Sequence, residues 1–274
     1  QAWAQVERLS GMSENTNSGT DESDPEPSLS VGFTSESSSA MSWQLPNKKS
    51  AASRHLLDAA EVPNTHKTPF ILSGYRPSPT GLCSLCQTIF TLHNETGNMW
   101  THLIGFGYFV FLAFQLILEL TGAEEGKNEL LWLLLLVFAS SLTLFQSFLY
   151  HLCLCTTTCV RDCTYKMDLS GIIALIVTSY FTGIALGYRC FPSLRRFYLL
   201  YAACISLLLA GPMVWPSLIS NMTRHLICCV GVGLLPAVHF CCISPSEDVA
   251  TVFPYLLAMF GCYASGAVFY LTRW

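Results

Sequence analysis

The sequence predicts an all-α fold, a polytopic transmembrane helix bundle, and two observations support this class. Six long stretches contain no Asp, Glu, Lys or Arg, namely residues 101–118, 130–160, 169–188, 197–223, 225–246 and 249–272. An α-helix rises ~1.5 Å per residue, so about eighteen apolar residues cross the ~30 Å hydrocarbon core of a bilayer. The whole chain is also 51% hydrophobic and only 12% charged, whereas an average soluble domain has about 25% charged residues.

We therefore expect six transmembrane spans in a bundle over residues 101–274. The spans are predicted near residues 101–119, 129–154, 167–188, 197–215, 223–243 and 250–272. The connections between them are short, which favours packing of successive helices as neighbours. Pro212 and Pro236 are expected to kink their helices, because proline lacks a backbone N–H.

The residues before the first span fall into two segments. Residues 1–47 are rich in Ser and acids, with seven acids and one base among the first 45, and such a composition predicts a disordered tail. Residues 48–100 are expected to form a cytosolic pre-membrane segment with short surface helices. Within it, "LCSLCQTIFTLHNE" (residues 82–95) has apolar residues near helical spacing, which suits a helix lying at the membrane surface.

Charge and cysteine usage exclude some function classes and leave others open. The formal net charge is −4 and no Lys- or Arg-rich run is present, so nucleic acid is not an expected partner. Most of the thirteen cysteines lie in apolar runs, where Cys acts as a small hydrophobic residue. The juxtamembrane group is a candidate for palmitoylation, with free thiols near lipid as the alternative; it comprises Cys153, Cys155, Cys159 and Cys163.

Three polar residues near the ends of the second and third spans are the candidate site. Ser147 and His151 are four residues apart, which places both on one helix face. Asp168 opens the third span, and because successive spans are antiparallel it lies at the same membrane face. Histidine is a common zinc ligand, and zinc lowers the pKa of a bound water to ~7. Alternatively, His151 lies at the headgroup level and Asp168 stabilises the start of its helix.

Other polar residues are assigned to structural roles. His102 falls on the same side of the membrane, where an interfacial anchor beside Trp100 is the favoured interpretation. His239 lies at the opposite end of its span and is excluded from the site. Glu95, together with Asn94 and Asn98, is expected to tie loops together before the first span rather than to react.

Several motifs resemble the progestin and adipoQ receptor family, which is related to bacterial haemolysin III. They are "GYR" (residues 74–76), "HNETGNMWTHL" (93–103), Ser147-x3-His151, "MDLSGI" (167–172) and "LPAVH" (235–239), and the resemblance covers about residues 66–272. It implies seven spans, a cytosolic N-terminus and an intramembrane zinc near the cytosolic face. In this resemblance His151 corresponds to a metal ligand, while Ser147 and Asp168 correspond to catalytic positions.

Two departures from the family pattern affect these expectations. The family's other two zinc histidines form an His-x3-His pair in a seventh span, and the chain ends at Trp274, after the sixth span. We therefore expect a fragment truncated after the sixth span that does not complete the zinc site or act as an enzyme by itself. The family's Asp-Tyr pair is also replaced by Asp168-Leu169, which removes a hydroxyl near the site.

The resemblance implies two functions from different classes. The first is a membrane receptor for a lipid, steroid or protein hormone, which acts in its full-length form as a zinc-dependent lipid amide (ceramide) hydrolase. The alternative is a non-catalytic Golgi scaffold that tethers a cytosolic signalling kinase. Membrane lipids are expected partners in both cases, and the expected location is the plasma membrane or the Golgi. The basic residues near the spans are balanced across the membrane, and Lys67 and Arg76 favour a cytosolic N-terminus.

Overall fold

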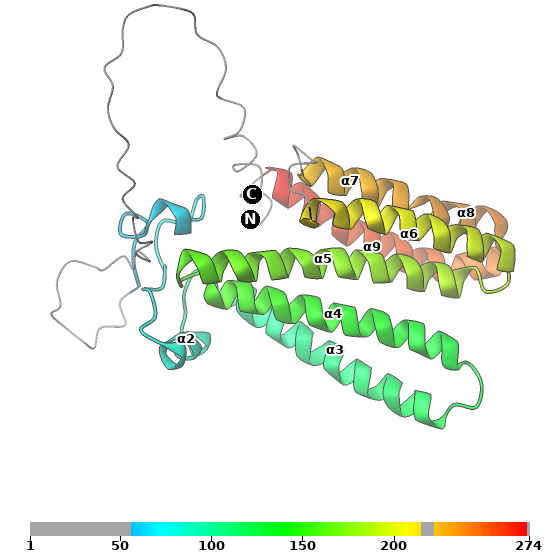
Figure 1. Cartoon of the computed structure of the whole chain (residues 1–274), viewed down its shortest axis with the longest axis horizontal. Coiled ribbons are helices and arrows are strands. Elements are labelled where there is room, and N and C mark those ends of the chain that lie inside the picture. The colour runs from blue at the N-terminus through cyan, green and yellow to red at the C-terminus, as the bar shows by residue number, and fades with distance from the viewer. Residues whose placement is uncertain (1–55, 215–221, 273–274) are drawn as a thin grey trace, which may run out of the picture.

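The computed structural model describes residues 56–214 and 222–272, and within these ranges the chain is mostly helical, apart from the irregular residues 56–81 (Figure 1). The short elements that precede the bundle are η1 (Asn64–His66), α2 (Leu82–Gln87) and η2 (Thr88–Phe90). The bundle comprises α3 (Thr96–Gly122), α4 (Lys127–Cys153), α5 (Thr158–Gly187), α6 (Pro192–Val214), α7 (Met222–Gly233), α8 (Leu235–Ile243) and α9 (Ser246–Thr272). The extended pairing in the described part is one antiparallel bridge, Leu57–Tyr75.

The predicted all-α membrane fold is confirmed. Five helices, namely α3, α4, α5, α6 and α9, are long and apolar enough to cross a bilayer. The first span begins earlier than expected, because the polar residues from Thr96 onward already belong to α3. The predicted disordered tail, residues 1–47, lies outside the described residues, and the domain boundaries stay a prediction.

The fifth expected span, residues 223–243, differs from the prediction because it is two helices, α7 and α8, rather than one. Pro236 has no N–H to donate to the carbonyl of Val232, four residues earlier. The Tyr201 hydroxyl donates to this carbonyl instead, at 2.8 Å. Tyr188, which is 2% exposed, donates its hydroxyl to the carbonyl of Pro236 at 2.6 Å. Side chains from the end of α5 and from α6 thus bind backbone groups at the break, as lipid-embedded structure requires.

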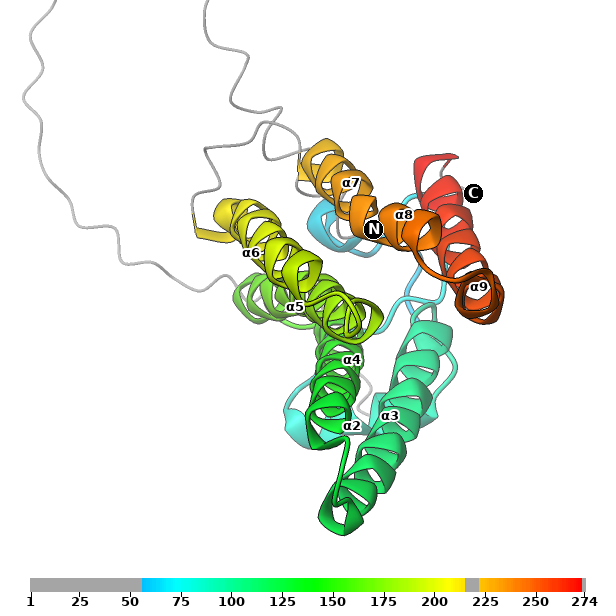
Figure 2. The same ribbon diagram turned by 90° about the vertical axis from the view of Figure 1, so that its right-hand side faces the viewer.

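Close packing between α4 and α5 sets the position of the candidate site. Helix α4 lies between α3 and α5, whereas α6 packs on the far side of α5 (Figure 2). Gly171 of α5 lies against the backbone of Thr143 in α4, and the Thr143 hydroxyl donates to the Gly171 carbonyl at 2.8 Å. Because glycine has no Cβ, the two backbones approach closely.

The pre-membrane segment packs on the end of the bundle at which α4 ends and α5 begins (Figure 1). Two long-range hydrogen bonds attach its η1 region to the α4–α5 connection and to the first turn of α5. His66 Nε2 lies 3.0 Å from the carbonyl oxygen of Thr156. The Arg161 guanidinium donates to the carbonyl of Thr65 at 2.5 Å. The segment therefore lies on the same side of the membrane as this connection.

The contacts at the helix break predict an effect of replacing Tyr188 by Phe. Tyr188→Phe removes the hydrogen bond to the Pro236 carbonyl, and we expect a loss of about 0.6–2 kcal/mol in the free energy of unfolding. The apparent melting temperature of the detergent-solubilised chain should fall. Tyr108→Phe is the matched control, because Tyr108 is 58% exposed on the lipid-facing side of α3. An equal melting temperature for Tyr188→Phe and the unchanged protein would contradict this account of the break.

Residues 56–95 lie on the same side of the membrane as the α4–α5 connection. The family resemblance implies that this side is cytosolic, and this orientation predicts which inserted acceptor sites are glycosylated. An acceptor site placed in the connection at residues 123–126 should be glycosylated, whereas one placed in residues 10–40 should stay unmodified. The measurement is the mass shift after expression in a glycosylating membrane system. Modification of the acceptor in residues 10–40 would show the opposite orientation.

Candidate functional site

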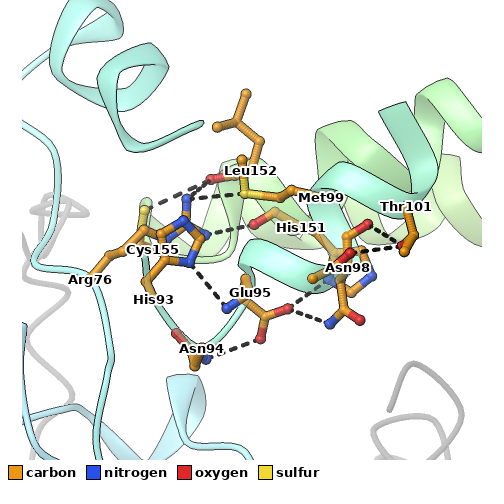
Figure 3. Close-up of polar contacts among 11 residues, drawn as sticks. Arg76, His93, Asn94, Glu95, Asn98, Met99, Thr101, His151, Leu152 and Cys155 are labelled. Carbon is orange, nitrogen blue, oxygen red and sulfur yellow. Dashed lines mark hydrogen bonds and ion pairs between the residues drawn. The ribbon is translucent and has the colours of Figure 1, made fainter. Parts of the chain in front are cut away.

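A buried carboxylate stands at the start of α3 and connects it to the end of α4 (Figure 3). Glu95 precedes the first residue of α3 and is 2% exposed. Its Oε2 accepts hydrogen bonds from His151 Nδ1 and Asn98 Nδ2, both at 2.8 Å. Its Oε1 accepts one from Asn94 Nδ2 at 3.1 Å. The carboxylate therefore has partners on both oxygens although it is removed from water.

These partners keep the Glu95 carboxyl charged. Burial by itself would raise the pKa of Glu95. The hydrogen bonds from His151 and Asn98 and the positive charge of Arg76 outweigh burial, so the pKa lies below its ordinary value. Glu95 is thus a carboxylate at neutral pH, and its negative charge also complements the N-terminus of α3.

A side chain from the pre-membrane segment caps the C-terminal end of α4. Arg76 is 5% exposed and donates to the carbonyls of His151 at 2.6 Å and Leu152 at 3.1 Å. A third bond from Arg76 reaches the Thr88 hydroxyl at 2.9 Å. The last carbonyls of an α-helix have no partner within the helix, and a cation is favourable there. Arg76 and Glu95 therefore hold His151 through its backbone and its ring respectively.

The structure brings the three predicted site residues together. Ser147, His151 and Asp168 are all buried, with 9%, 9% and 6% exposure. The Ser147 side chain and His151 are both close enough to the Asp168 carboxyl to interact with it electrostatically. The i,i+4 spacing and the antiparallel spans thus give the expected proximity, while the metal-binding and catalytic roles stay predictions.

Two interpretations of neighbouring residues change. The ring of His102 lies 5.3 Å from the ring of His151, centroid to centroid, and His102 Nδ1 is buried without a hydrogen-bond partner in the described part of the chain. His102 therefore belongs to the site rather than serving as an interfacial anchor. Glu95 was expected to tie loops together, and it also binds His151. His239 Nδ1 lies 2.7 Å from the hydroxyl of Tyr198, which is near the start of α6. His239 is therefore away from the site, as expected.

Comparisons with known proteins assign the chain to a family. Residues 90–274 match the family described as Haemolysin-III related. The chain belongs to this family, and it is a member of the progestin and adipoQ receptor group within it. It is similar to Heptahelical transmembrane protein 1 of Arabidopsis thaliana, with 30% identity over 82% of this chain and 72% of the relative.

Two animal relatives carry the group's name. Progestin and adipoQ receptor-like protein 1 of Caenorhabditis elegans is 29% identical over 74% of this chain and 48% of the relative. Progestin and adipoQ receptor family member 3 of Homo sapiens is 26% identical over 78% of this chain and 72% of the relative. With this family assigned, the protein is an integral multi-pass membrane protein.

The zinc that the family resemblance implies fits one residue of the site. His151 uses Nδ1 on the Glu95 carboxylate, which leaves Nε2 free of hydrogen bonds among the described residues. Metal-binding histidines commonly show this arrangement, in which a carboxylate fixes the ring and its tautomer. However, residues 56–214 and 222–272 contain no group of three His, Cys, Asp or Glu that could hold a metal ion. The described residues therefore fit one zinc ligand and do not complete a zinc site.

The role of Arg76 predicts that lysine cannot replace it. Arg76→Lys keeps the charge but loses the planar fork that reaches two carbonyls and a hydroxyl. We expect a loss of about 1.5–3 kcal/mol in the free energy of unfolding, since the lost bonds involve a charged group. Arg189→Lys is the control, because Arg189 is exposed at the other end of α5. Thermal unfolding in detergent is the measurement, and equal effects of the two substitutions would contradict the proposed role.

Proposed function

We propose that this protein is a membrane receptor of the progestin and adipoQ receptor family that acts on lipids at the Glu95–His151 site. In its complete form it is a zinc-dependent hydrolase of a lipid amide of the ceramide type. The observation that supports this function is the hydrogen bond from His151 Nδ1 to the Glu95 carboxylate, beside the Ser147–Asp168 pair. Polar and ionisable groups are costly within membrane spans, so a buried cluster of them favours a functional role.

Each side chain has a separate part in this proposal. His151 supplies one metal-binding nitrogen, and Glu95 holds its ring in one orientation and one tautomer. Asp168 accepts a hydrogen bond from a water molecule and orients it, and the Ser147 hydroxyl holds the Asp168 carboxyl in place. Zinc in such a site supplies a water that ionises near neutral pH. Two further protein ligands are required, and we propose that an His-x3-His pair in a seventh span provides them.

The location of the site favours a lipid substrate. Ser147 and His151 belong to the last turns of α4, and Asp168 lies in the first half of α5. The site is thus at one end of the membrane-spanning helices, where the headgroup of a lipid and the start of its acyl chains are found. The amide of a sphingolipid lies at this depth. A steroid or a hydrophobic hormone would also reach the site from the bilayer.

The alternative function is a non-catalytic membrane scaffold that tethers a cytosolic signalling kinase at the Golgi. This function requires no metal, and residues 56–214 and 222–272 by themselves do not complete a zinc site. In a scaffold, Glu95 and His151 would act only as a buried structural pair. Zinc content separates the two proposals, since a scaffold of this type needs no metal.

Zinc analysis of the polypeptide extended through the proposed seventh span tests the first function. The extended protein should contain about one zinc per chain and lose it in His151→Ala. Glu95→Gln and Ser147→Ala should weaken zinc binding ~10- to 100-fold, because both act on the ligand sphere from outside. Residues 1–274 alone should bind zinc weakly, since catalytic zinc sites use three protein ligands. The measurements are elemental analysis and competition with a chelator.

His239→Ala is the matched control, because His239 lies away from the site and contacts Tyr198. Its zinc content should equal that of the unchanged protein. Unchanged zinc in His151→Ala would contradict the ligand assignment. Zinc binding without hydrolysis of a fluorescent ceramide would contradict the enzyme, whereas a complete protein without zinc would favour the scaffold.

A further inference from the structure

An uncharged segment before the first span exposes large apolar side chains. Residues 77–92 contain no Asp, Glu, Lys or Arg. Within this segment Leu82, Phe90 and Leu92 are 81%, 80% and 84% exposed. Exposure of leucine and phenylalanine side chains to water is unfavourable, and moving them into an apolar phase lowers the free energy. A group of them with so much free surface indicates contact with another apolar phase.

The segment has a clear inner and outer side. Leu85 of α2 is buried in a cluster with Met99 of α3 and Phe148 of α4. Ile89 packs against the same cluster, whereas Leu82 and Phe90 are not part of it and are exposed. The apolar residues of the segment thus exceed what its contact with the bundle requires, and the outer ones are not part of the protein core.

The exposed residues are continuous with the lipid-facing surface of α3. The indole N–H of Trp100 donates to the carbonyl of Ile89 at 3.0 Å, and the rings of Trp100 and Phe90 meet edge to face with centroids 6.2 Å apart. On the same face of α3 follow Ile104, Tyr108 and Phe111, which are 65%, 58% and 55% exposed. In a membrane-spanning helix these side chains face the acyl chains. Tryptophan at this position is typical of the interface between water and lipid.

We propose that residues 77–92 form a bilayer anchor, in which Leu82, Phe90 and Leu92 insert into the boundary between headgroups and acyl chains. The partner is the lipid surface of the membrane that α3 crosses. Such a segment lies in the plane of the interface rather than spanning the membrane. The absence of charge in residues 77–92 fits burial at this depth, and the anchor does not depend on zinc or on hydrolysis.

The anchor is attached directly to the site. Arg76, at its start, donates to Thr88 within the anchor and to the backbone carbonyl of His151. The His93 ring, just after the anchor, contacts the Thr88 carbonyl at 3.1 Å and accepts a hydrogen bond from the Glu95 N–H at 3.0 Å. Contact with the bilayer therefore holds the segment that supplies both Arg76 and Glu95 to His151.

Photo-crosslinking in the full chain tests the anchor. The chain is reconstituted in nanodiscs of phosphatidylcholine and phosphatidylserine, with p-benzoylphenylalanine in place of Phe90 or Leu92. Replacement of Phe111 gives the reference for lipid contact, and replacement of Asn64, a polar exposed residue of η1, gives the background. Mass spectrometry counts phospholipid adducts. Yields at positions 90 and 92 should be close to that at 111 and at least ~5-fold above that at 64.

Yields at 90 and 92 equal to the background would overturn the proposal, and so would adducts with a second protein chain in place of lipid. Hydroxyl-radical footprinting of the unmodified protein gives a second measurement that needs no substitution. In nanodiscs Leu82, Phe90 and Leu92 should be protected from oxidation, whereas exposed residues of the 58–67 region react. Oxidation of all three at the rate expected from their free surface would refute the anchor even if the substituted chains fail to fold.

Discussion

The contact between Glu95 and His151 is the interaction on which the rest of this end of the molecule depends. Moving a carboxylate out of water costs several kcal/mol unless the charge is paired and hydrogen-bonded. Glu95 avoids this cost only if α3, α4 and the preceding turn meet in one arrangement, because its partners come from all three. Arg76 adds the same requirement from the pre-membrane segment, since its buried guanidinium needs the carbonyls at the end of α4. The pre-membrane segment and the bundle are thus one structural unit, and His151 lies where they join.

The same physical requirement explains the other end of the bundle. Pro236 frees a carbonyl where no water is available, and the hydroxyls of Tyr188, directly after α5, and Tyr201, in α6, bind the carbonyls around the break. Polar side chains therefore serve different purposes at the two ends. Around Pro236 the tyrosine hydroxyls donate to backbone carbonyls, so both the hydroxyl of Tyr188 and the carbonyl of Pro236 have a hydrogen-bond partner. Around His151 they leave an imidazole nitrogen, and nearby His102 Nδ1, without partners in the described residues, which is the arrangement that a binding site requires.

Charge-free runs predicted the long helices because a bilayer selects strongly for length and apolarity, which are local properties of sequence. The proximity of Ser147, His151 and Asp168 was also predictable, since it needs only helical spacing and antiparallel spans. A kink at Pro236 was predicted from its missing N–H, but the complete break at Gly233 and Leu234 was not, because it depends on tyrosines from elsewhere in the bundle that bind the carbonyls around it. The part that Glu95 takes in the site was missed because Glu95 and His151 are 56 residues apart. The sequence feature that could have indicated this role is a single acidic residue, Glu95, between two asparagines and directly before an apolar span.

A double-mutant cycle between Glu95 and His151 tests the central claim most directly. The variants are Glu95→Gln, His151→Phe and the double substitution, each compared with the unchanged chain by reversible unfolding in detergent or bicelles. If the two side chains form the buried pair described above, the single losses will not add, and the interaction energy will lie at about 0.5–3 kcal/mol. Additive losses, with an interaction energy of zero, would show that Glu95 does not hold His151.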